Sequence, residues 1–385
     1  MNLPTVAAGG SPHELLAALV AIPSVNPAYD PQSPGENALG DAILAWGREL
    51  GFRADAYEVV DGRRNVQLRL ASAHSRRTLL IEGHLDTVGL TAPHASTTAH
   101  VVNGRLTGRG ACDAKGAIAA ALIALSELAA RPPQHTDVVF LGAIDEEFRF
   151  RGVSAFIAED TLPDVAVVLE PTELRIVAQH NGVVRVEILV TGRSAHTSRP
   201  DEGRNAVVDA LELVRRLTAW NERNIASAPD LPPRILAVTT IAGGTAINVI
   251  PDECRIGIDL RTRPAEDANR VLAELDEFLA TAHGITAQVD RILLIDSGMS
   301  TDTTSDIVVA AQRAAGLHQL PVEAVRVPYG TDGSKLARAG VPTIVFGPGS
   351  IRDAHGDEEW VALDDVATAA RVLVDVVRAY DEAGS

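Results

Sequence analysis

The chain has 385 residues, of which 46% are hydrophobic and 22% charged, so it is long enough for two globular domains with sizeable cores. Its formal net charge of −17 argues against nucleic acid or an anionic membrane as a partner, but not against an anionic substrate, because bound metal ions can reverse the local field. Only two cysteines are present, Cys112 and Cys254, which excludes a disulfide framework and a cysteine-rich zinc site.

The first part of the chain alternates predicted helices with predicted strands. Ser11-Pro12-His13-Glu14 has the form of a capping box that opens a helix through Ala21. Gly51 is placed to end a second helix over about 36–50. The elements predicted next are strands near 53–59, 65–70 and 77–82 and a buried helix over 115–130. Such alternation predicts a mostly parallel sheet that helices cover on both faces.

The pattern changes from about residue 177. Residues 183–190 contain an alternation of apolar and polar side chains, as expected of a sheet with one solvated face. The elements predicted next are a helix over 205–220, strands near 235–241 and 254–261, a helix over 265–283 and a strand through Asp290. This β-α-β-β-α-β order is that of the ferredoxin-like motif. The α/β pattern then returns and ends in a helix over 364–381.

The sequence therefore predicts an α/β fold with two domains. One domain is discontinuous, comprises residues 1–177 and 292–385, and contains a mostly parallel sheet covered by helices. The other is an inserted ferredoxin-like α+β domain over residues 178–291.

Acidic and histidine motifs follow three of the apolar, strand-like runs of the first domain. They are Gly83-His84-Leu85-Asp86-Thr87, Asp145-Glu146-Glu147 and Glu170-Pro171-Thr172. Ligands of open α/β sheets gather just outside the carboxyl ends of the strands. Together with Asp113-Ala114-Lys115-Gly116 and a lone His355, these residues look like a metal centre, so the sequence predicts a metallohydrolase.

Each of these residues has a simpler structural interpretation when it is taken alone. His84 on its own would more often be an ordinary surface or core histidine, but Asp86 favours metal binding, since a ligating histidine usually donates its other N–H to a carboxylate. Glu146 and Glu147 could be a solvated acidic pair, yet they follow an apolar strand and repel each other there. Different tasks would explain them, with Glu147 on a metal and Glu146 free to handle protons.

Taken in order, these motifs resemble those of the M20 metallopeptidase family. Residues 19–27 (Leu-Val-Ala-Ile-Pro-Ser-Val-Asn-Pro) and 110–116 add to the resemblance, which spans essentially the whole chain. That family contains acetylornithine deacetylases, succinyl-diaminopimelate desuccinylases, aminoacylases and glutamate-type carboxypeptidases. The segment 347–351 before Ala354-His355 is most similar to the acetylornithine-deacetylase branch.

The resemblance implies two zinc ions per chain, with Asp113 bridging them. His84 and Glu170 would complete one ion, and Glu147 and His355 the other. Two Zn²⁺, three carboxylates and a bridging hydroxide together carry no net charge. Co²⁺ or Mn²⁺ could substitute for zinc in such a mixed imidazole and carboxylate site.

The resemblance also implies roles in proton transfer and in backbone geometry. Glu146 corresponds to the general base, which takes the proton of the attacking water and later gives it to the leaving amine. Asp86 would belong to the catalytic set as the partner of His84. The peptide bond between Asp113 and Ala114 is expected to be cis.

For the inserted domain, the resemblance implies a lid through which the chain forms a homodimer. His196 would reach the partner's active site and stabilise the oxyanion there. Asn248 and Arg261 match family positions that hold a substrate carboxylate, although Arg261 could instead form a salt bridge within its sheet. The loops that contain Thr331 and Gly349 are expected to line the pocket.

Two departures from the family pattern affect the expected substrate more than the chemistry. Asp113 begins Asp-Ala-Lys-Gly-Ala, where Asp-Met-Lys-Gly-Gly is commoner. Phe148-Arg149-Phe150-Arg151 is bulkier and more basic than the small residues usual after Asp-Glu-Glu. Those side chains could shape a wall of the substrate pocket.

We therefore predict a dizinc amidohydrolase that cleaves an N-acyl amino acid or a similar small N-acylated amine. A metallo-exopeptidase acting on dipeptides or short peptides is the first alternative. A metal-binding protein without activity is disfavoured because the predicted base, Glu146, is present, and a serine hydrolase is disfavoured because the sequence has no Gly-x-Ser-x-Gly motif. No lysine or arginine precedes Arg48 and the most apolar stretch, 117–125, is too short for a membrane span, so we expect a cytoplasmic location.

Overall fold

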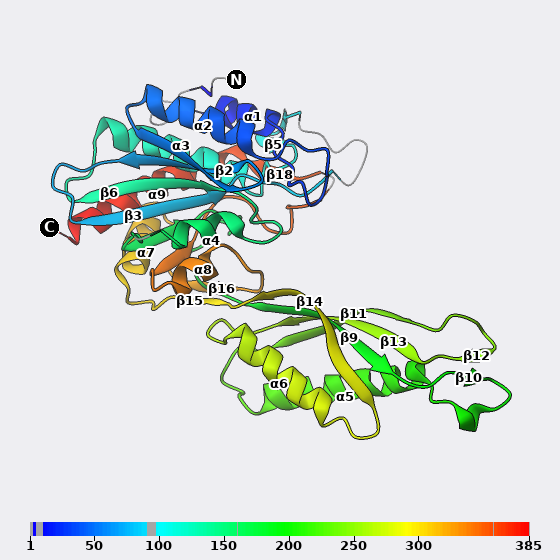
Figure 1. The fold of residues 1–385 in the computed structure, drawn as a ribbon. Helices are drawn as coiled ribbons and strands as arrows, with labels where there is room; N and C mark the ends of the chain where they lie inside the picture. The colour runs from blue at the N-terminus through cyan, green and yellow to red at the C-terminus, as the bar shows by residue number, and fades with distance from the viewer. Residues whose placement is uncertain (1–2, 5–10, 91–97, 160, 357, 385) are drawn as a thin grey trace. The chain divides into compact units, whose positions relative to one another are not determined.

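The chain forms two compact units in a computed structural model, shown in Figure 1. The structure describes residues 3–4, 11–90, 98–159, 161–356 and 358–384. Unit 1 comprises Met1–Ala178, Thr301–Arg326 and Thr331–Ser385, and unit 2 comprises Gln179–Ser300 and Val327–Gly330. Unit 2 extends beyond the predicted boundary at residue 291, because strand β14 continues through that position as far as Asp296.

Unit 1 is built on a sheet whose strands follow the order β1-β2-β6-β3-β7-β17-β8. β6, β3, β7 and β17 are parallel neighbours, whereas β1 pairs antiparallel with β2, β2 with β6, and β8 with β17. The fold is therefore mixed α/β with a mostly parallel central sheet, as predicted. The strands are β1 (Arg53–Val60), β2 (Arg63–Leu70), β3 (Arg77–His84), β6 (Thr136–Ala143), β7 (Val165–Val168), β8 (Val177–His180) and β17 (Thr343–Val345).

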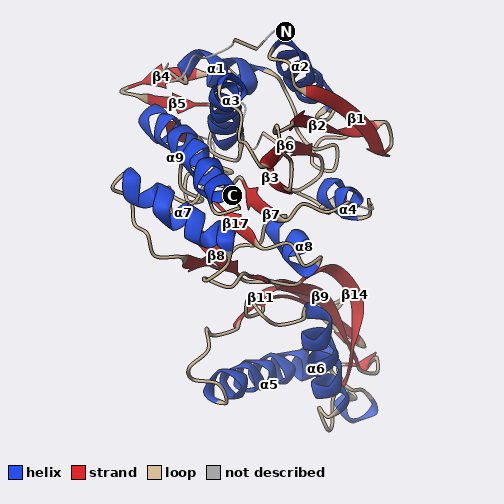
Figure 2. Cartoon of the chain, turned by 90° about the vertical axis from the view of Figure 1, so that its left-hand side faces the viewer, coloured by secondary structure: helices blue, strands red, loops and turns tan. Residues whose placement is uncertain are grey.

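Helices cover both faces of this sheet. In Figure 2, α3, α9 and α7 lie in a row on one side of the strands, and α4 and α8 lie on the other. All residues of α3 from Lys115 to Leu125 are buried, and the many alanines among them let neighbouring elements approach closely. The helices are α1 (His13–Ala21), α2 (Asn37–Glu49), α3 (Lys115–Ala130), α4 (Arg151–Ile157), α7 (Asp306–Leu317), α8 (Gly333–Arg338) and α9 (Leu363–Glu382).

The predicted helices of unit 1 are found within about a turn of their expected bounds. The predicted capping box of α1 is wrong, because Pro12 is the N-cap residue and its O accepts the first helical hydrogen bond, from Leu16 N. Ser11 lies one residue before the N-cap, and its Oγ accepts from His13 N at 3.3 Å rather than from Glu14 N as a capping box requires.

A small separate sheet contains β4 (His100–Val102), β5 (Arg105–Thr107) and β18 (Trp360–Ala362).

Unit 2 has the predicted β-α-β-β-α-β order. Its four-stranded sheet follows the order β11-β13-β9-β14, with every neighbouring pair antiparallel. The apolar residues of β9 that alternate along the strand belong to the same buried core as apolar residues of both helices. The elements are β9 (Val183–Thr191), α5 (Ala206–Ala226), β11 (Ile235–Gly243), β13 (Glu253–Arg261), α6 (Ala268–Ala280) and β14 (Thr286–Asp296). β10 (Ala195–His196) and β12 (Val249–Ile250) pair with each other in a separate two-stranded sheet, whereas β15 (Met299–Ser300) and β16 (Val325–Val327) pair with β8.

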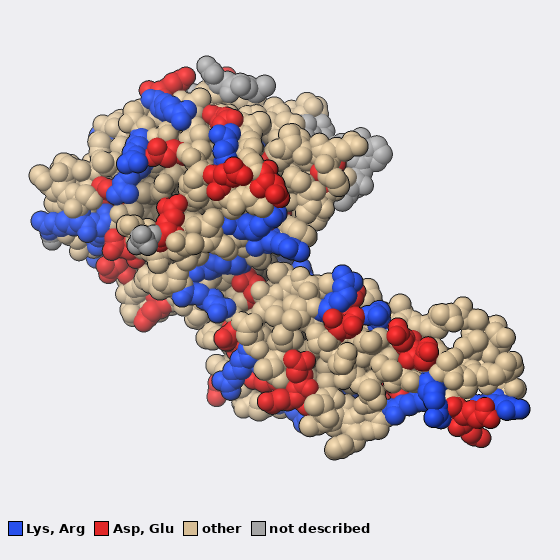
Figure 3. Space-filling model, in the orientation of Figure 1, with Lys and Arg blue, Asp and Glu red and all other residues tan. Residues whose placement is uncertain are grey.

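Acidic and basic side chains are interspersed on the face drawn in Figure 3, so the net charge of −17 is not gathered into one acidic patch there. Among the described residues, no helix is long and apolar enough to cross a membrane.

Candidate metal centre

Three parallel strands deliver the acidic and histidine motifs to one edge of the unit 1 sheet. His84 is the last residue of β3, Asp145-Glu146-Glu147 follows β6, and Glu170 follows β7. Since β6, β3 and β7 are parallel neighbours, their carboxyl ends lie side by side. The sheet therefore brings these motifs together as predicted from the apolar runs.

Two further residues, Asp113 and His355, complete the cluster from loops. Asp113 precedes Ala114, the N-cap residue of α3, and the peptide bond between the two is cis, as the family resemblance implied. Asp113 Oδ1 lies 2.9 Å from His84 Nε2, and Asp113 Oδ2 lies 3.1 Å from His355 Nε2. Glu147 Oε1 is 3.1 Å from the same His355 nitrogen, and Glu170 Oε1 is 3.9 Å from His84 Nε2. The five predicted ligands thus lie together. Asp113 is at their centre, with His84 next to one of its carboxylate oxygens and His355 next to the other.

The described residues contain two overlapping groups of possible metal ligands. Each group has its ligand atoms within 4.8 Å of one another. The groups are His84, Asp113 and Glu147, and His84, Glu146 and Glu170. Glu146 therefore lies against the ligand cluster, close enough to exchange protons with a molecule bound there.

Most of the cluster is buried, although His355 is exposed, and burial dominates the electrostatics of its carboxylates. Burial raises the pKa of Glu146 and of Glu170 well above the ordinary value and also raises the pKa of Glu147, and neighbouring carboxylates add to each shift. Burial opposes the charged form of Asp113 too, but hydrogen bonds with His355 and His84 hold its pKa below the ordinary value. Hydrogen bonds with Asp113 and Glu147 raise the pKa of His355 to about 10.

The hydrogen bonding of His84 tests whether this cluster fits a cation. His84 Nδ1 lies 3.0 Å from the main-chain oxygen of Asp86, an acceptor that requires the proton to be on Nδ1. In the neutral ring Nε2 is then also an acceptor, and it faces the carboxylate oxygen of Asp113 at 2.9 Å. Positive charge is therefore needed between these two atoms. A second ring proton can supply it, because, although burial opposes the charged form of His84, hydrogen bonds with Asp113 and Asp86 raise its pKa well above the ordinary value. A divalent ion such as zinc can supply it instead, and the imidazole and carboxylate donors around the two atoms suit such an ion. The residues present therefore fit a metal centre.

Asp86 has a contact pattern that differs from the prediction. Its carboxylate lies 3.7 Å from His84 Nδ1, because the ring hydrogen bond goes to the main-chain oxygen of Asp86 instead. The Asp86 carboxylate accepts hydrogen bonds from Glu146 N at 3.0 Å and from Glu147 N at 3.1 Å. Asp86 therefore holds the main chain of both glutamates, a function that its position beside His84 did not indicate.

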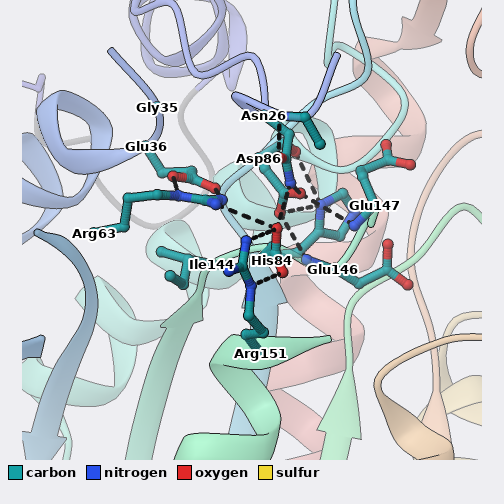
Figure 4. Close-up of polar contacts among 12 residues, drawn as sticks. Asn26, Gly35, Glu36, Arg63, His84, Asp86, Ile144, Glu146, Glu147 and Arg151 are labelled. Carbon is teal, nitrogen blue, oxygen red and sulfur yellow. Dashed lines mark hydrogen bonds and ion pairs between the residues drawn. The ribbon is translucent and has the colours of Figure 1, made fainter. Parts of the chain in front are cut away.

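Sequence reasoning did not assign Asn26, Arg63 or Arg151 to the support of the turn that carries Glu146 and Glu147. Figure 4 shows their polar contacts beside the two glutamates: Asn26 donates to Asp86, and Asn26, Arg63 and Arg151 all donate to Asp145. Asn26 belongs to the family-like segment 19–27 and Arg151 to the bulky, basic segment 148–151, but neither feature indicated these contacts.

The loop of Asp113 has its own support, also missed from sequence. Glu359 Oε1 accepts hydrogen bonds from Cys112 N and Asp113 N, each at 3.0 Å. Glu359 Oε2 pairs with Arg109 Nη1 at 2.6 Å, and both side chains are buried. Lys115, just beyond the loop, donates to Ile22 O at 2.7 Å, and burial lowers its pKa to about 7.

A further acidic pair lies buried near the cluster. Burial raises the pKa of Glu82 well above the ordinary value, with the Asp332 charge adding to the shift. Burial likewise raises the pKa of Asp332 to about 7, although the Lys335 charge opposes this. Asp332 lies in the Thr331 loop that was expected to line the pocket, but neither Asp332 nor Glu82 was singled out as an acidic candidate.

The candidate substrate residues are distributed over both units. In unit 1, Thr331 is fully buried and its Oγ1 accepts from Gly333 N at 3.1 Å, while Gly349 has a φ of +82° and lies against Cys112. In unit 2, His196 is exposed, with Nδ1 2.8 Å from Ser198 Oγ. Asn248 O accepts from Thr197 N at 3.2 Å. Arg261 Nε donates to Asp259 Oδ1 at 2.8 Å, so the salt bridge considered as its alternative is present.

A protein family, related sequences and solved structures that match this chain are known. The model of peptidase family M20/M25/M40 matches residues 80–379. An acetylornithine deacetylase of Yersinia pestis is 30% identical over 367 residues, which cover 90% of this chain and 92% of that protein. An acetylornithine deacetylase of Myxococcus xanthus is 32% identical over 344 residues, covering 85% and 88%. A tripeptidase structure from Staphylococcus aureus superposes with a TM-score of 0.80 at 19% identity, covering 98% of this chain and 100% of the other, and shows the shared fold.

Proposed function

The chain belongs to peptidase family M20/M25/M40, and on that premise we propose that it is a two-metal amidohydrolase that cleaves an N-acyl amino acid or a similar small N-acylated amine. The observation that carries the proposal is Asp113, whose two oxygens face His84 and His355 at 2.9 and 3.1 Å within a cluster of carboxylates. The deacetylases at 30–32% identity favour a deacylase over the alternative, a metallo-exopeptidase of the same family.

In this proposal Asp113 would hold two divalent ions together. His84 and Glu170 would help to hold one ion, and Glu147 and His355 the other. Zinc suits the donor set, with Co²⁺ or Mn²⁺ as substitutes. Bound there, the ions would supply Lewis-acid activation of the amide carbonyl and of the attacking water.

Glu146 performs the proton transfers in the proposed reaction. It follows β6, and its main-chain N–H is held by Asp86, so its carboxylate is kept beside the ligand cluster. Glu146 takes a proton from the water that attacks the carbonyl carbon and gives it to the leaving nitrogen. The amide C–N bond then breaks, and the products are a carboxylate and a free amine.

We assign the remaining predicted residues to substrate binding and to the dimer. Asn248 and Arg261 are candidates for holding the substrate carboxylate, with Thr331 and Gly349 in loops around the pocket. The proposed homodimer forms through unit 2, and His196 of the partner subunit stabilises the oxyanion. Within unit 2, β11 is an edge strand with exposed Ile235, Val238 and Ile241, which supports such an interface. The protein is proposed to work in the cytoplasm, without nucleic acid or membrane partners.

A substrate panel tests this function. Zinc-loaded protein is incubated with N-acetyl, N-succinyl and N-formyl amino acids, dipeptides and tripeptides, and release of free amine is measured. We expect hydrolysis of at least one acylated amino acid at a higher kcat/KM than any peptide. Faster cleavage of the peptides would favour the exopeptidase alternative.

Metal content is the first prediction. Protein reconstituted with zinc should bind about two ions per chain, lose its hydrolytic activity in a chelator and regain it when zinc is restored. Elemental mass spectrometry and activity are measured on the same samples. Activity that persists in protein shown to contain no metal would contradict the proposal.

Subunit complementation is the second prediction. Glu146→Ala and His196→Ala proteins should each be nearly inactive, and activity should return when the two are mixed under conditions of subunit exchange. A heterodimer would contain one site with both defects and one site with neither. Exchange is verified by native mass spectrometry. Exchange without any recovery of activity would show that His196 does not act in the partner's site.

A further inference from the structure

A single amide side chain joins two carboxylates behind the candidate metal centre (Figure 4). Asn26 Nδ2 donates to Asp86 Oδ2 at 2.8 Å and to Asp145 Oδ1 at 2.9 Å. Its Oδ1 accepts from Ala28 N at 3.0 Å, which fixes the orientation of the amide. Both hydrogens of the amide nitrogen are therefore used, one for each carboxylate.

The segment that carries Asn26 is itself attached to the β3 motif. Asn26 N donates to Thr87 O at 2.9 Å, and Thr87 N donates to Ser24 O at 3.0 Å, which makes a parallel bridge between the two segments. Asn26 and both of its acceptor residues are buried. The amide is thus placed by main-chain contacts, without relying on its own side-chain bonds.

Both acceptors of the amide control the position of Glu146 and Glu147. Asp86 accepts the main-chain N–H groups of both glutamates. Asp145 directly precedes them, and its φ of +68° shows that the turn starts in a conformation that non-glycine residues seldom adopt. Holding the Asp145 side chain therefore helps to fix the turn from which the two glutamates project.

Charge explains why an amide is suited to this position. Asp145 is neutralised by Arg63 Nη1 at 3.3 Å and by Arg151 Nε at 2.5 Å, and Arg63 is in turn paired with Glu36. Asn26 adds a donor to each carboxylate without adding charge. An aspartate of the same shape would instead place a third carboxylate against Asp86 and Asp145, and alanine would leave both without this donor.

We propose that Asn26 is a positioning residue that sets the turn of Glu146 and Glu147 through Asp86 and Asp145. The inference rests on the proposed function, in which Glu147 binds metal and Glu146 transfers protons. Asn26 touches neither substrate nor metal, and its effect passes through hydrogen bonds to the two aspartates.

The test compares Asn26→Asp and Asn26→Ala in the full-length protein loaded with Co²⁺. The readouts are the visible absorption spectrum of bound cobalt, the cobalt content per chain, and kcat and KM for the best substrate of the panel. Outer partners of metal ligands typically contribute about 10–100-fold to metal affinity or activity, and we expect a loss of that size in kcat or cobalt affinity with a smaller change in KM. The cobalt spectrum should change, since Glu147 would no longer be held in place.

The order of the two variants separates positioning from simple packing. Asn26→Asp preserves the shape but reverses the polarity of both contacts, so it should be the more damaging of the two. A packing role predicts the opposite order, because alanine leaves a cavity. Asn221→Asp is the matched control: Asn221 is a buried asparagine of unit 2 that donates to Arg234 O at 3.4 Å, and this variant should keep the wild-type spectrum and kcat.

The outcomes distinguish this inference from the proposed function. Wild-type protein that binds no cobalt would contradict the metal centre and the positioning role together. Wild-type protein that binds cobalt, beside an Asn26→Asp protein with the same spectrum and kcat, would overturn only the role of Asn26. Greater damage from Asn26→Ala than from Asn26→Asp would overturn it as well.

Discussion

Glu146→Gln is expected to lose about 10²–10⁴-fold in kcat, the range that general acid–base catalysis typically supplies. Glutamine keeps the shape of the side chain and its main-chain hydrogen bond to Asp86, so the turn should persist. It cannot accept the proton of the attacking water, and this removes the base from the reaction. The measurement is kcat for the best substrate, together with the zinc content of the same protein.

Glu147→Gln is the informative companion to this variant. The two residues are adjacent and both are held by Asp86, but only Glu147 contacts His355, at 3.1 Å between Oε1 and Nε2. We therefore expect Glu147→Gln to lose metal as well as activity, whereas Glu146→Gln keeps both ions. Glu159→Gln, an exposed change just after α4, should behave as wild type. Near wild-type kcat in zinc-loaded Glu146→Gln would show that Glu146 is not the base.

The features that the sequence predicted well are those that local pattern determines. The apolar runs that become β3, β6 and β7 end at His84, Asp145 and Glu170, and parallel pairing of buried strands brings such ends to one edge. The bounds of α3, Lys115–Ala130, agree with the prediction because its apolar run stops at Arg131-Pro132-Pro133. The five ligand candidates could therefore be identified, and the structure brings them together.

The supports of the site could not be predicted, because they depend on contacts between distant residues. Asn26 reaches Asp145 across 119 positions, and Glu359 reaches Asp113 across 246. Asp86 and Glu359 bind main-chain N–H groups, which every residue type except proline carries, so no residue pattern marks those partners. The contact of Asp86 with the glutamates follows from how the ends of β3 and β6 pack, which local spacing does not specify.

The predicted boundary of unit 2 and the predicted end of α5 were inaccurate for a different reason. β14 extends past residue 291 because pairing with β9 continues there through two register shifts, which no break in the sequence marks. α5 continues to Ala226, beyond the predicted end at Trp220, because the residues that follow include neither glycine nor proline before the helix ends. Tertiary pairing and the absence of a breaker decided these ends.

Glu359→Ala is expected to destabilise unit 1 by about 3–5 kcal/mol, the usual effect of removing one partner of a buried ion pair. The change leaves the Arg109 guanidinium buried without its carboxylate and removes the acceptor of Cys112 N and Asp113 N. Denaturant unfolding of the metal-free protein measures this loss directly. Metal-free conditions are needed because bound ions would add their own stabilisation.

Two variants separate the contribution of the Glu359 charge from that of its hydrogen bonds to Cys112 N and Asp113 N. Glu359→Gln retains an oxygen that can accept from the Asp113 loop but leaves Arg109 unbalanced, so it should recover only part of the stability. Adding Arg109→Met to Glu359→Gln removes the second charge and should recover more of it. Zinc affinity is measured in parallel, and Glu359→Ala should weaken it, because the main chain of Asp113 is no longer held. Stability and zinc affinity close to wild type in Glu359→Ala would show that the loop is held by other contacts.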